Sequence, residues 1–576
     1  MPSASLVHSP FAIDYGHAVE QELYALETTI RVYPTIYAHF PARWLAIKLL
    51  EQDQEIRLQL TGLAGGPALL AQAQQSYDKL HQQIGEEVDV LIADRRYTWI
   101  HTLVGAVVQQ PGVDLTVSDK VDGIVTHRLL GVPIFLAVMW VVFKVTADVS
   151  APLVDWIDGV ISGPLTHWAV LLLNAGGLGE SWLTSLVVDG VIAGVGGVLV
   201  FVPVLMALYT SLALLEESGY MARAAFVMDH LMARIGLQGK SFLPMLVGFG
   251  CTVPAIYATR TLENEKDRIL TALLTPFMSC GARLPVYVLF ATVFFPQYAG
   301  VVVFSMYLLG IAVAILLGLV LRKTLFNHNE QSALLMELPA YHRPHWGVVW
   351  AHTWERTRSF LENAWSLILV MSLILWLLMA IPVGARAGAF AQTNVDQSLF
   401  ATVAGTLSPL LAPLGFGTWE ASGALISGFV AKEVVVSTVA QTYGIAETAG
   451  ATLPTTVAQD LVAIGRSFGQ ALLDTVKAVP LIVGIDLSDG ADDALASDLR
   501  QSIYAGFEAS SGGHAALAGL AFMVFVLIYT PCMVAVAAEK QELGAKWMWY
   551  SVVGQLVLAW LLALLVFQGG LFLGLG

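Results

Sequence analysis

The sequence predicts an all-α polytopic membrane protein, in which about eight transmembrane helices follow a small helical cytoplasmic domain. The 576-residue chain has a mean hydropathy of +0.68, and only 13% of its residues are charged, against about 25% in soluble domains. Many apolar stretches reach the roughly 20 residues that a helix needs to cross a bilayer. Several of them contain proline or glycine, so we expect some membrane helices to be broken or re-entrant, as in transporters.

The first part of the chain differs from the rest in composition. We expect residues 1–14 to be disordered. Residues 15–110 are polar, and apolar residues recur there at helical spacing, as in Leu23, Leu26 and Ile30. This pattern predicts a helical domain, which we place in the cytoplasm because basic residues precede the first span. The first 15 residues lack a basic stretch followed by an apolar run, so no cleavable signal peptide is predicted.

Hydrophobicity predicts eight full spans in the rest of the chain. They are residues 129–149, 187–215, 269–295, 301–321, 364–381, 421–443, 515–538 and 547–573. Residues 241–258 and 399–416 are also apolar, but they are rich in glycine or proline and are therefore poor continuous helices. We expect residues 241–258 to enter the membrane and return as a re-entrant loop.

Polar segments between the spans predict the orientation. Basic residues place the segment 322–363 in the cytoplasm. Within it, Trp346, Trp350 and Trp354 follow one another at four-residue steps, which predicts an amphipathic helix lying at the membrane surface. Residues 444–512 include an acidic run without a comparable basic cluster, so we place them on the opposite side.

All three cysteines lie where a predicted membrane helix is interrupted. Cys251 lies in GFGCTVP (248–254), Cys280 in PFMSCGARLP (276–285), and Cys532 in YTPC (529–532). A single cysteine could simply be a small apolar residue, but three of three beside a helix-breaking proline favour a functional interpretation. Thiolates and thioethers suit a late first-row metal ion and do not suit sodium, potassium or magnesium. Met278 could add a thioether, or it could be a methionine that faces the core or the lipid.

Charged residues inside or beside apolar runs are a second signal. Glu216 and Glu217 end the second span, and Lys432 and Glu433 lie within the sixth. Such groups are costly in a bilayer and mark an ion path or pair with one another. The alternative for the two glutamates is an interfacial helix end, and the alternative for Lys432 and Glu433 is a local structural ion pair.

Other functions are disfavoured by what the sequence contains. The formal charge of −15 argues against a nucleic-acid partner. Three cysteines in apolar segments are not a disulfide framework. The run 236–241 (GLQGKS) resembles the end of a phosphate loop, but Arg234 occupies the position of its first glycine. We therefore expect no catalytic residue, no nucleotide-binding motif and no permanently bound cofactor in this chain.

Several motifs occur together in one order along the membrane part. Beside the three cysteine runs these are LLEESGYMAR (214–223), ATRTL (258–262), MELP (336–339) and KEVV (432–435). Through them, residues 120–575 resemble the membrane domain of the ferrous iron transport protein B family. The resemblance implies a permease with two gate-like repeats, at about 185–322 and 400–575, related in arrangement to nucleoside transporters. It also implies that the Cys251 and Cys532 segments are matching gate elements of the two halves.

Residues 15–110 are similar to the helical domain of the same family, which responds to nucleotide. Members normally begin with a small GTPase domain, which this sequence lacks. We therefore expect a split system with a separately encoded G-domain protein, so that GTP acts only through that partner. The alternative is transport that is not driven by nucleotide. A small SH3-like accessory protein is a further expected partner.

The resemblance implies uptake of Fe(II), as the transported substrate, through a bacterial cytoplasmic (inner) membrane. Cys251, Cys280, Cys532 and Met278 would be soft ligands along the path, and Glu216 and Glu217 would supply charge where the path begins. Because the ion must leave again, we expect a partial and exchangeable coordination shell. Alternatives are a transporter of manganese, zinc or a nucleoside, and a thiol-based membrane redox sensor. The energy source, the oligomeric state (a homo-oligomer is possible) and the metal preference stay open.

Overall fold

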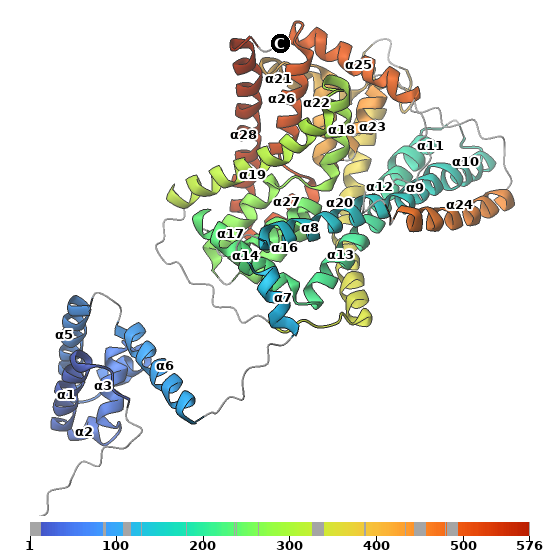
Figure 1. Cartoon of the computed structure of the whole chain (residues 1–576). Coiled ribbons are helices and arrows are strands. Elements are labelled where there is room, and N and C mark those ends of the chain that lie inside the picture. Colours follow the sequence, from blue (N-terminus) through green and yellow to red (C-terminus); the bar gives the residue numbers. More distant parts are fainter. Residues whose placement is uncertain are drawn as a thin grey trace, which may run out of the picture. The chain divides into compact units, whose positions relative to one another are not determined.

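The structure, a computed structural model, divides the chain into two compact units, Met1–Leu115 and Thr116–Gly576 (Figure 1). It describes residues 13–84, 88–107, 117–127, 130–179, 181–235, 237, 239–262, 264–324, 339–384, 388–432, 434–442, 457–478, 480 and 494–574. The predicted disordered segment 1–14 lies almost wholly outside them. Within the described ranges the elements are helices, and no β-strand occurs, which confirms the predicted fold class.

The first unit is a bundle built on the apolar spacing of its sequence. Leu23, Leu26 and Ile30 are fully buried, as a helix with one apolar face requires. The aspartate side chain at the start of the fourth helix, Asp53, accepts a hydrogen bond from the backbone N–H of Ile56 at 3.3 Å and caps that helix. The helices are α1 (His17–Val32), α2 (Pro34–Tyr37), α3 (Ala42–Leu50), α4 (Gln54–Thr61), α5 (Gly66–Ile84) and α6 (Val88–Val107).

The second unit holds the helices α7 to α28. They are α7 (Val117–Val125), α8 (Gly131–Lys144), α9 (Ala151–Val160), α10 (Thr166–Ala175), α11 (Trp182–Ser185), α12 (Ala193–Leu199), α13 (Phe201–Glu217), α14 (Tyr220–Ile235), α15 (Phe242–Gly250), α16 (Thr252–Ala258), α17 (Glu265–Leu274), α18 (Leu284–Phe294), α19 (Ala299–Thr324), α20 (Trp346–Ala380), α21 (Leu399–Leu411), α22 (Trp419–Val430), α23 (Val434–Thr442), α24 (Val457–Ala478), α25 (Ala494–Ser511), α26 (Ala515–Ile528), α27 (Met533–Leu543) and α28 (Ala545–Phe572).

Seven helical stretches of the described chain are long and apolar enough to cross a membrane, and the bent pair of α21 and α22 makes an eighth if it counts as one span. The two helices of this pair meet at 105°. The number agrees with the predicted eight spans, but the eighth is this bent pair and not the predicted span 421–443, because α22 ends at Val430. The seven stretches are Gly131–Ala175, Trp182–Glu217, Glu265–Phe294, Ala299–Thr324, Trp346–Ala380, Ala515–Leu543 and Ala545–Phe572.

Two predicted boundaries differ from the structure. The first span does not end near residue 149 but continues through π-helical turns to Ala175. Asp155, Asp158 and Pro164 lower the hydropathy and helix propensity of this continuation, which is why the sequence did not predict it. The tryptophans of residues 346–354 also do not form a separate surface helix. They begin α20, which runs without interruption for 35 residues into the predicted fifth span.

Apolar packing at the centre of the second unit uses aromatic rings from both halves of the chain. Phe290 of α18 stacks on Phe522 of α26, with ring centroids 4.6 Å apart, and Phe507 of α25 meets Phe522 edge-on at 5.7 Å. Helix α19 lies against this core through Gly310, where an added Cβ would be 2.7 Å from the carbonyl oxygen of Phe277. A glycine therefore lets α19 approach the irregular backbone between α17 and α18.

Replacing Gly310 by alanine is expected to destabilise the protein by about 1–3 kcal/mol, because the added methyl group meets backbone that cannot turn aside. The matched control is Gly300→Ala on the same helix, where nothing lies within 4 Å of the added Cβ. Thermal unfolding of the purified full chain in detergent measures the difference. Equal melting temperatures for both variants would show that α19 does not pack this closely.

Candidate functional site

Besides the bend between α21 and α22, four helices are interrupted in the described part of the second unit, two in each half of the chain. We name each interruption by one residue. The Cys251 break separates α15 from α16, the Cys280 break (275–283) separates α17 from α18, the Lys432 break (residues 431 and 432) separates α22 from α23, and the Cys532 break (529–532) separates α26 from α27. The three cysteine breaks were predicted. The Lys432 break was not, because residues 421–443 contain no proline, and the buried charge of Lys432 was the one signal for it.

The order of the breaks differs from the expected correspondence of Cys251 with Cys532. The first break of each half has the same extended backbone, with φ −152° and ψ 129° at Cys251 and φ −150° and ψ 124° at Ala431. The second breaks are those of Cys280 and Cys532. By position along the two halves, Cys251 therefore matches Ala431, and Cys280 matches Cys532.

Each cysteine occupies the position just before a helical segment. Cys251 precedes α16, Cys532 precedes α27, and Cys280 precedes the 3-10 turn Gly281–Arg283 that leads into α18. The first N–H groups of a helix have no partner within it and carry partial positive charge. All three cysteines are thiols and not disulfides, Cys280 buried and the other two half-buried.

Helices α16 and α27 pack side by side and run in the same direction. At their first residues, Cys251 and Cys532 pack against one apolar cluster, made of Val253, Ile256, Ala364, Val534, Ala535 and Ala538. At their far ends, the hydroxyl of Tyr257 donates to Gln541 Oε1 at 3.1 Å, and Arg260 Nε donates to the Glu542 carboxylate at 2.8 Å. The first residues of α16 contact those of α27, and the last residues of the two helices also contact each other. The Cys251 and Cys532 thiols therefore lie at the same end of the packed pair.

Cys280 and Met278 lie deeper in the same region. A Cβ added to Gly281 would be 3.8 Å from the carbonyl oxygen of Gly250, so the Cys280 break adjoins the Cys251 break. Met278 is 3% exposed, and its Cβ would be 3.1 Å from a Cβ added to Gly248. Its side chain belongs to the main hydrophobic core, which is the arrangement that the alternative of a core-facing methionine describes.

Two buried cations converge on the Cys532 break. Lys432 Nζ donates to the carbonyl oxygens of Val526 at 3.1 Å and Tyr529 at 3.4 Å. The guanidinium of Arg283 donates to the carbonyl oxygens of Pro276 at 3.0 Å and, more weakly, Tyr529 at 3.5 Å. A helix break frees carbonyl oxygens that water cannot reach in a bilayer, and these cations satisfy them. Glu433, the expected ion-pair partner of Lys432, lies outside the described residues.

The structure places Glu216 and Glu217 at the end of α13. Glu216 is exposed and pairs with Arg356 of α20 at 2.9 Å, with side-chain exposures of 58% and 39%. A pair this exposed contributes little stability. Glu217 is half-buried. For Glu216, the alternative interpretation as an interfacial helix end fits this geometry.

Arg223 is a buried residue whose role the sequence did not indicate. It is 1% exposed, and its guanidinium donates two hydrogen bonds to Asp122 of α7, at 2.9 and 3.0 Å. It also lies over the ring of Tyr341, 4.1 Å from the ring centre. Because the Asp122 carboxylate accepts these hydrogen bonds, it raises the pKa of the arginine. Arg223 thus fastens α7, which precedes the first span, to α14.

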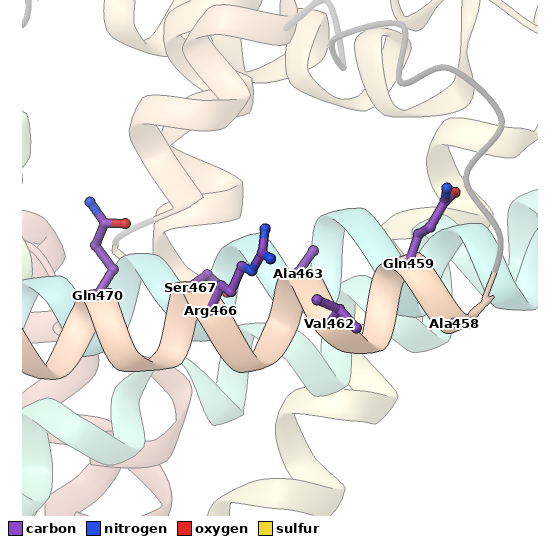
Figure 2. Close-up of a pocket in the computed structure, with 7 residues that line it drawn as sticks. All are labelled: Ala458, Gln459, Val462, Ala463, Arg466, Ser467 and Gln470. Atoms are coloured by element: carbon purple, nitrogen blue, oxygen red, sulfur yellow. The ribbon is translucent and has the colours of Figure 1, made fainter.

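The described residues contain no group of three or more His, Cys, Asp or Glu side chains that could hold a metal ion. The hollow in Figure 2 lies elsewhere, along α24. Its seven lining residues, between Ala458 and Gln470, all come from that one helix. It is an open helix face and offers no convergent ligands. The cysteine breaks are therefore the candidate site.

Broken membrane helices in two halves, with thiols and buried cations at the breaks, define a multi-pass transporter of the broken-helix class. Comparison with known proteins agrees. Residues 198–294 and 361–546 match the Gate family model, described as nucleoside recognition. Residues 303–356 match the model of the ferrous iron transport protein B C terminus, and residues 15–109 match the FeoB cytosolic helical domain. The chain belongs to the Fe(2+) transporter FeoB family.

Curated relatives match over most of the chain. The Fe(2+) transporter FeoB of Staphylococcus aureus (strain MSSA476) is 35% identical over 569 residues, which are 97% of this chain and 74% of the relative. That of Methanocaldococcus jannaschii is 34% identical over 530 residues, covering 91% and 69%. A fusion of Fe(2+) transport protein A with FeoB from Porphyromonas gingivalis is 35% identical over 597 residues, covering 98% and 65%. The comparison with solved structures gave no match.

Proposed function

We propose that the protein is a ferrous iron uptake permease, in which Cys251 and Cys532 bind Fe(II) in passage. The observation that carries this proposal is the parallel packing of α16 and α27, because it sets a thiol from each half at the same end of one helix pair. Sulfur ligands suit a late first-row ion. The names of the relatives, all Fe(2+) transporters, select iron among such ions.

The coordination shell is partial in this proposal. Two thiols, with Cys280 and Met278 deeper along the path, offer fewer ligands than a closed four-ligand site and so let the ion leave. Glu216 and Glu217 supply negative charge where the path begins. The substrate undergoes no covalent chemistry.

The proposed setting is a bacterial inner membrane, with the first unit in the cytoplasm. We further propose that a separately encoded G-domain protein acts on that unit, so that GTP enters the cycle only through the partner. A small accessory protein is the second proposed partner. The fusion of Fe(2+) transport protein A with the relative from Porphyromonas gingivalis supports this second association.

The test is uptake of radiolabelled Fe(II) by bacteria that lack their own ferrous iron transport. Expression of this chain is expected to raise uptake, and co-expression of a free-standing G-domain protein is expected to raise it further. Excess Mn(II) or Zn(II) distinguishes the metals: stronger inhibition by either than by unlabelled Fe(II) would assign the permease to that ion. Absence of net uptake, with and without the G-domain protein, would favour a redox sensor instead.

A further inference from the structure

A carboxylate is buried on α27, the half-helix that begins after Cys532. Glu539 is 1% exposed, and its Oε1 accepts a hydrogen bond from the hydroxyl of Ser551 at 3.0 Å. The Ser551 oxygen in turn accepts from Gln555 Nε2 at 2.7 Å. Ser551 and Gln555, on α28, are themselves 5% and 2% exposed. The three side chains form a hydrogen-bonded chain between two membrane helices.

Two acceptor atoms among these three side chains lack a hydrogen-bond donor. Glu539 Oε2 and Gln555 Oε1 are buried without a hydrogen-bond partner. Protonation of Glu539 would supply a donor to this group of side chains. The carboxyl O–H can then donate to the Ser551 oxygen, and the serine hydroxyl can donate to Gln555 Oε1 once the amide turns over. The carboxyl oxygen left over is then part of a neutral group, whose burial costs far less than that of a charge.

No charged group compensates Glu539. In the part of the chain that the structure describes, it forms no hydrogen bond or ion pair with any charged side chain on α27 or on the elements packed against it. Arg260 pairs with Glu542, Arg356 with Glu216 and Arg358 with Glu362. The remaining charged or titratable side chains of these elements are Tyr257 of α16, His352 and Glu355 of α20, Glu420 of α22, Lys540 of α27, and Lys546 and Tyr550 of α28.

A proton fits this site better than a metal ion. One proton neutralises a single carboxylate, whereas a divalent ion would leave a net positive charge buried in the bilayer. Glu539 also belongs to no group of three metal-binding side chains among the described residues. Because it lies seven residues after Cys532, it is two turns along the same face of the half-helix.

We propose that Glu539, with Ser551 and Gln555, is a proton-binding site within the membrane, and that proton release from it assists Fe(II) past the Cys532 thiol. The second part rests on the proposed function. An ionised Glu539 two turns beyond the thiol attracts a cation that leaves it, whereas a protonated Glu539 does not.

Infrared difference spectroscopy of the purified full chain in lipid nanodiscs tests the proton site without any transport. At neutral pH, where exposed carboxylates are ionised, we expect a protonated-carboxyl band that Glu539→Gln abolishes and Ser551→Ala shifts. Glu542→Gln, one turn away and paired with Arg260, is the matched control and should keep the band. If the Glu539→Gln spectrum equals that of the wild type, Glu539 is not protonated and the proposal fails.

The pH profile of Fe(II) uptake tests the link to transport. Uptake by the wild type is expected to rise with pH by up to about tenfold per unit, the limit for release of one proton. Glu539→Gln should transport with a flatter profile, because glutamine mimics the neutral form permanently. An unchanged profile would overturn the link. If the wild type moves no Fe(II), the proposed function fails, and the infrared result still decides the proton site.

Discussion

Replacing both Cys251 and Cys532 by serine is expected to lower Fe(II) uptake at least about tenfold. Serine is close to cysteine in size but offers a hydroxyl in place of a soft thiolate. Even changes beside the ligands of a metal site lower affinity about 10- to 100-fold, so loss of two ligands should cost no less. Each single variant should show a smaller loss, because the thiol of the other half remains.

The measurement is the initial rate of radiolabelled Fe(II) uptake in cells, normalised to the amount of protein in the membrane. Met139→Leu is the matched control: this methionine is buried on α8 in a cluster against which Cys251 packs, it is not a predicted ligand, and its replacement conserves volume. It should transport like the wild type. Full uptake by the double serine variant would show that neither the Cys251 thiol nor the Cys532 thiol is needed to bind Fe(II) during transport.

Replacing Arg283 by methionine is expected to lower the free energy of unfolding by at least about 2 kcal/mol. The guanidinium is fully buried and donates to the carbonyl oxygens of Pro276 and Tyr529, each at a helix break. The Tyr529 carbonyl keeps its bond from Lys432, but the Pro276 carbonyl loses the donor described here. A buried carbonyl left without its donor costs about 1–3 kcal/mol. Burial of the charge is itself unfavourable, but methionine cannot donate to either oxygen, so we expect the loss of hydrogen bonds to dominate.

Thermal unfolding of the purified full chain in detergent measures this effect. Arg358→Met removes an arginine of the same size whose pair with Glu362 is exposed on both sides, and it should change the melting temperature little. Arg283→Lys should be intermediate, because an ammonium group can reach one carbonyl but lacks the planar geometry for both. A melting temperature at or above that of the wild type for Arg283→Met would mean that desolvation of the charge outweighs its hydrogen bonds.

The sequence predicted the membrane class and three of the four breaks, because proline or glycine lies at or beside each of those three. It could not predict the break at Lys432, which depends on carbonyl acceptors almost a hundred residues away, at Val526 and Tyr529. Hydropathy placed Glu539 just outside a span that ended at residue 538. Only the packing of α28, which brings Ser551 and Gln555 over it, shows that the carboxylate is buried.

The sequence also did not show which helix breaks of the two halves correspond to each other. The family resemblance implied that the Cys251 and Cys532 segments are equivalent, whereas the order of broken helices matches Cys251 with Ala431. A local motif carries no information about which element of a repeat it belongs to. The convergence of the two thiols therefore comes from the packing of α16 against α27 and could not be read from either segment alone.

The carbonyl oxygen of Tyr529 accepts from a lysine of one break and an arginine of another, and this shared acceptor restricts how the molecule can move. Any movement of the Cys532 break that displaces Tyr529 would stretch both bonds at once. It must either break them together or carry residues 276–283 and Lys432 along with it. In the proposed permease, an opening that displaces Tyr529 would then be a concerted step of three breaks and not the independent fraying of a single helix.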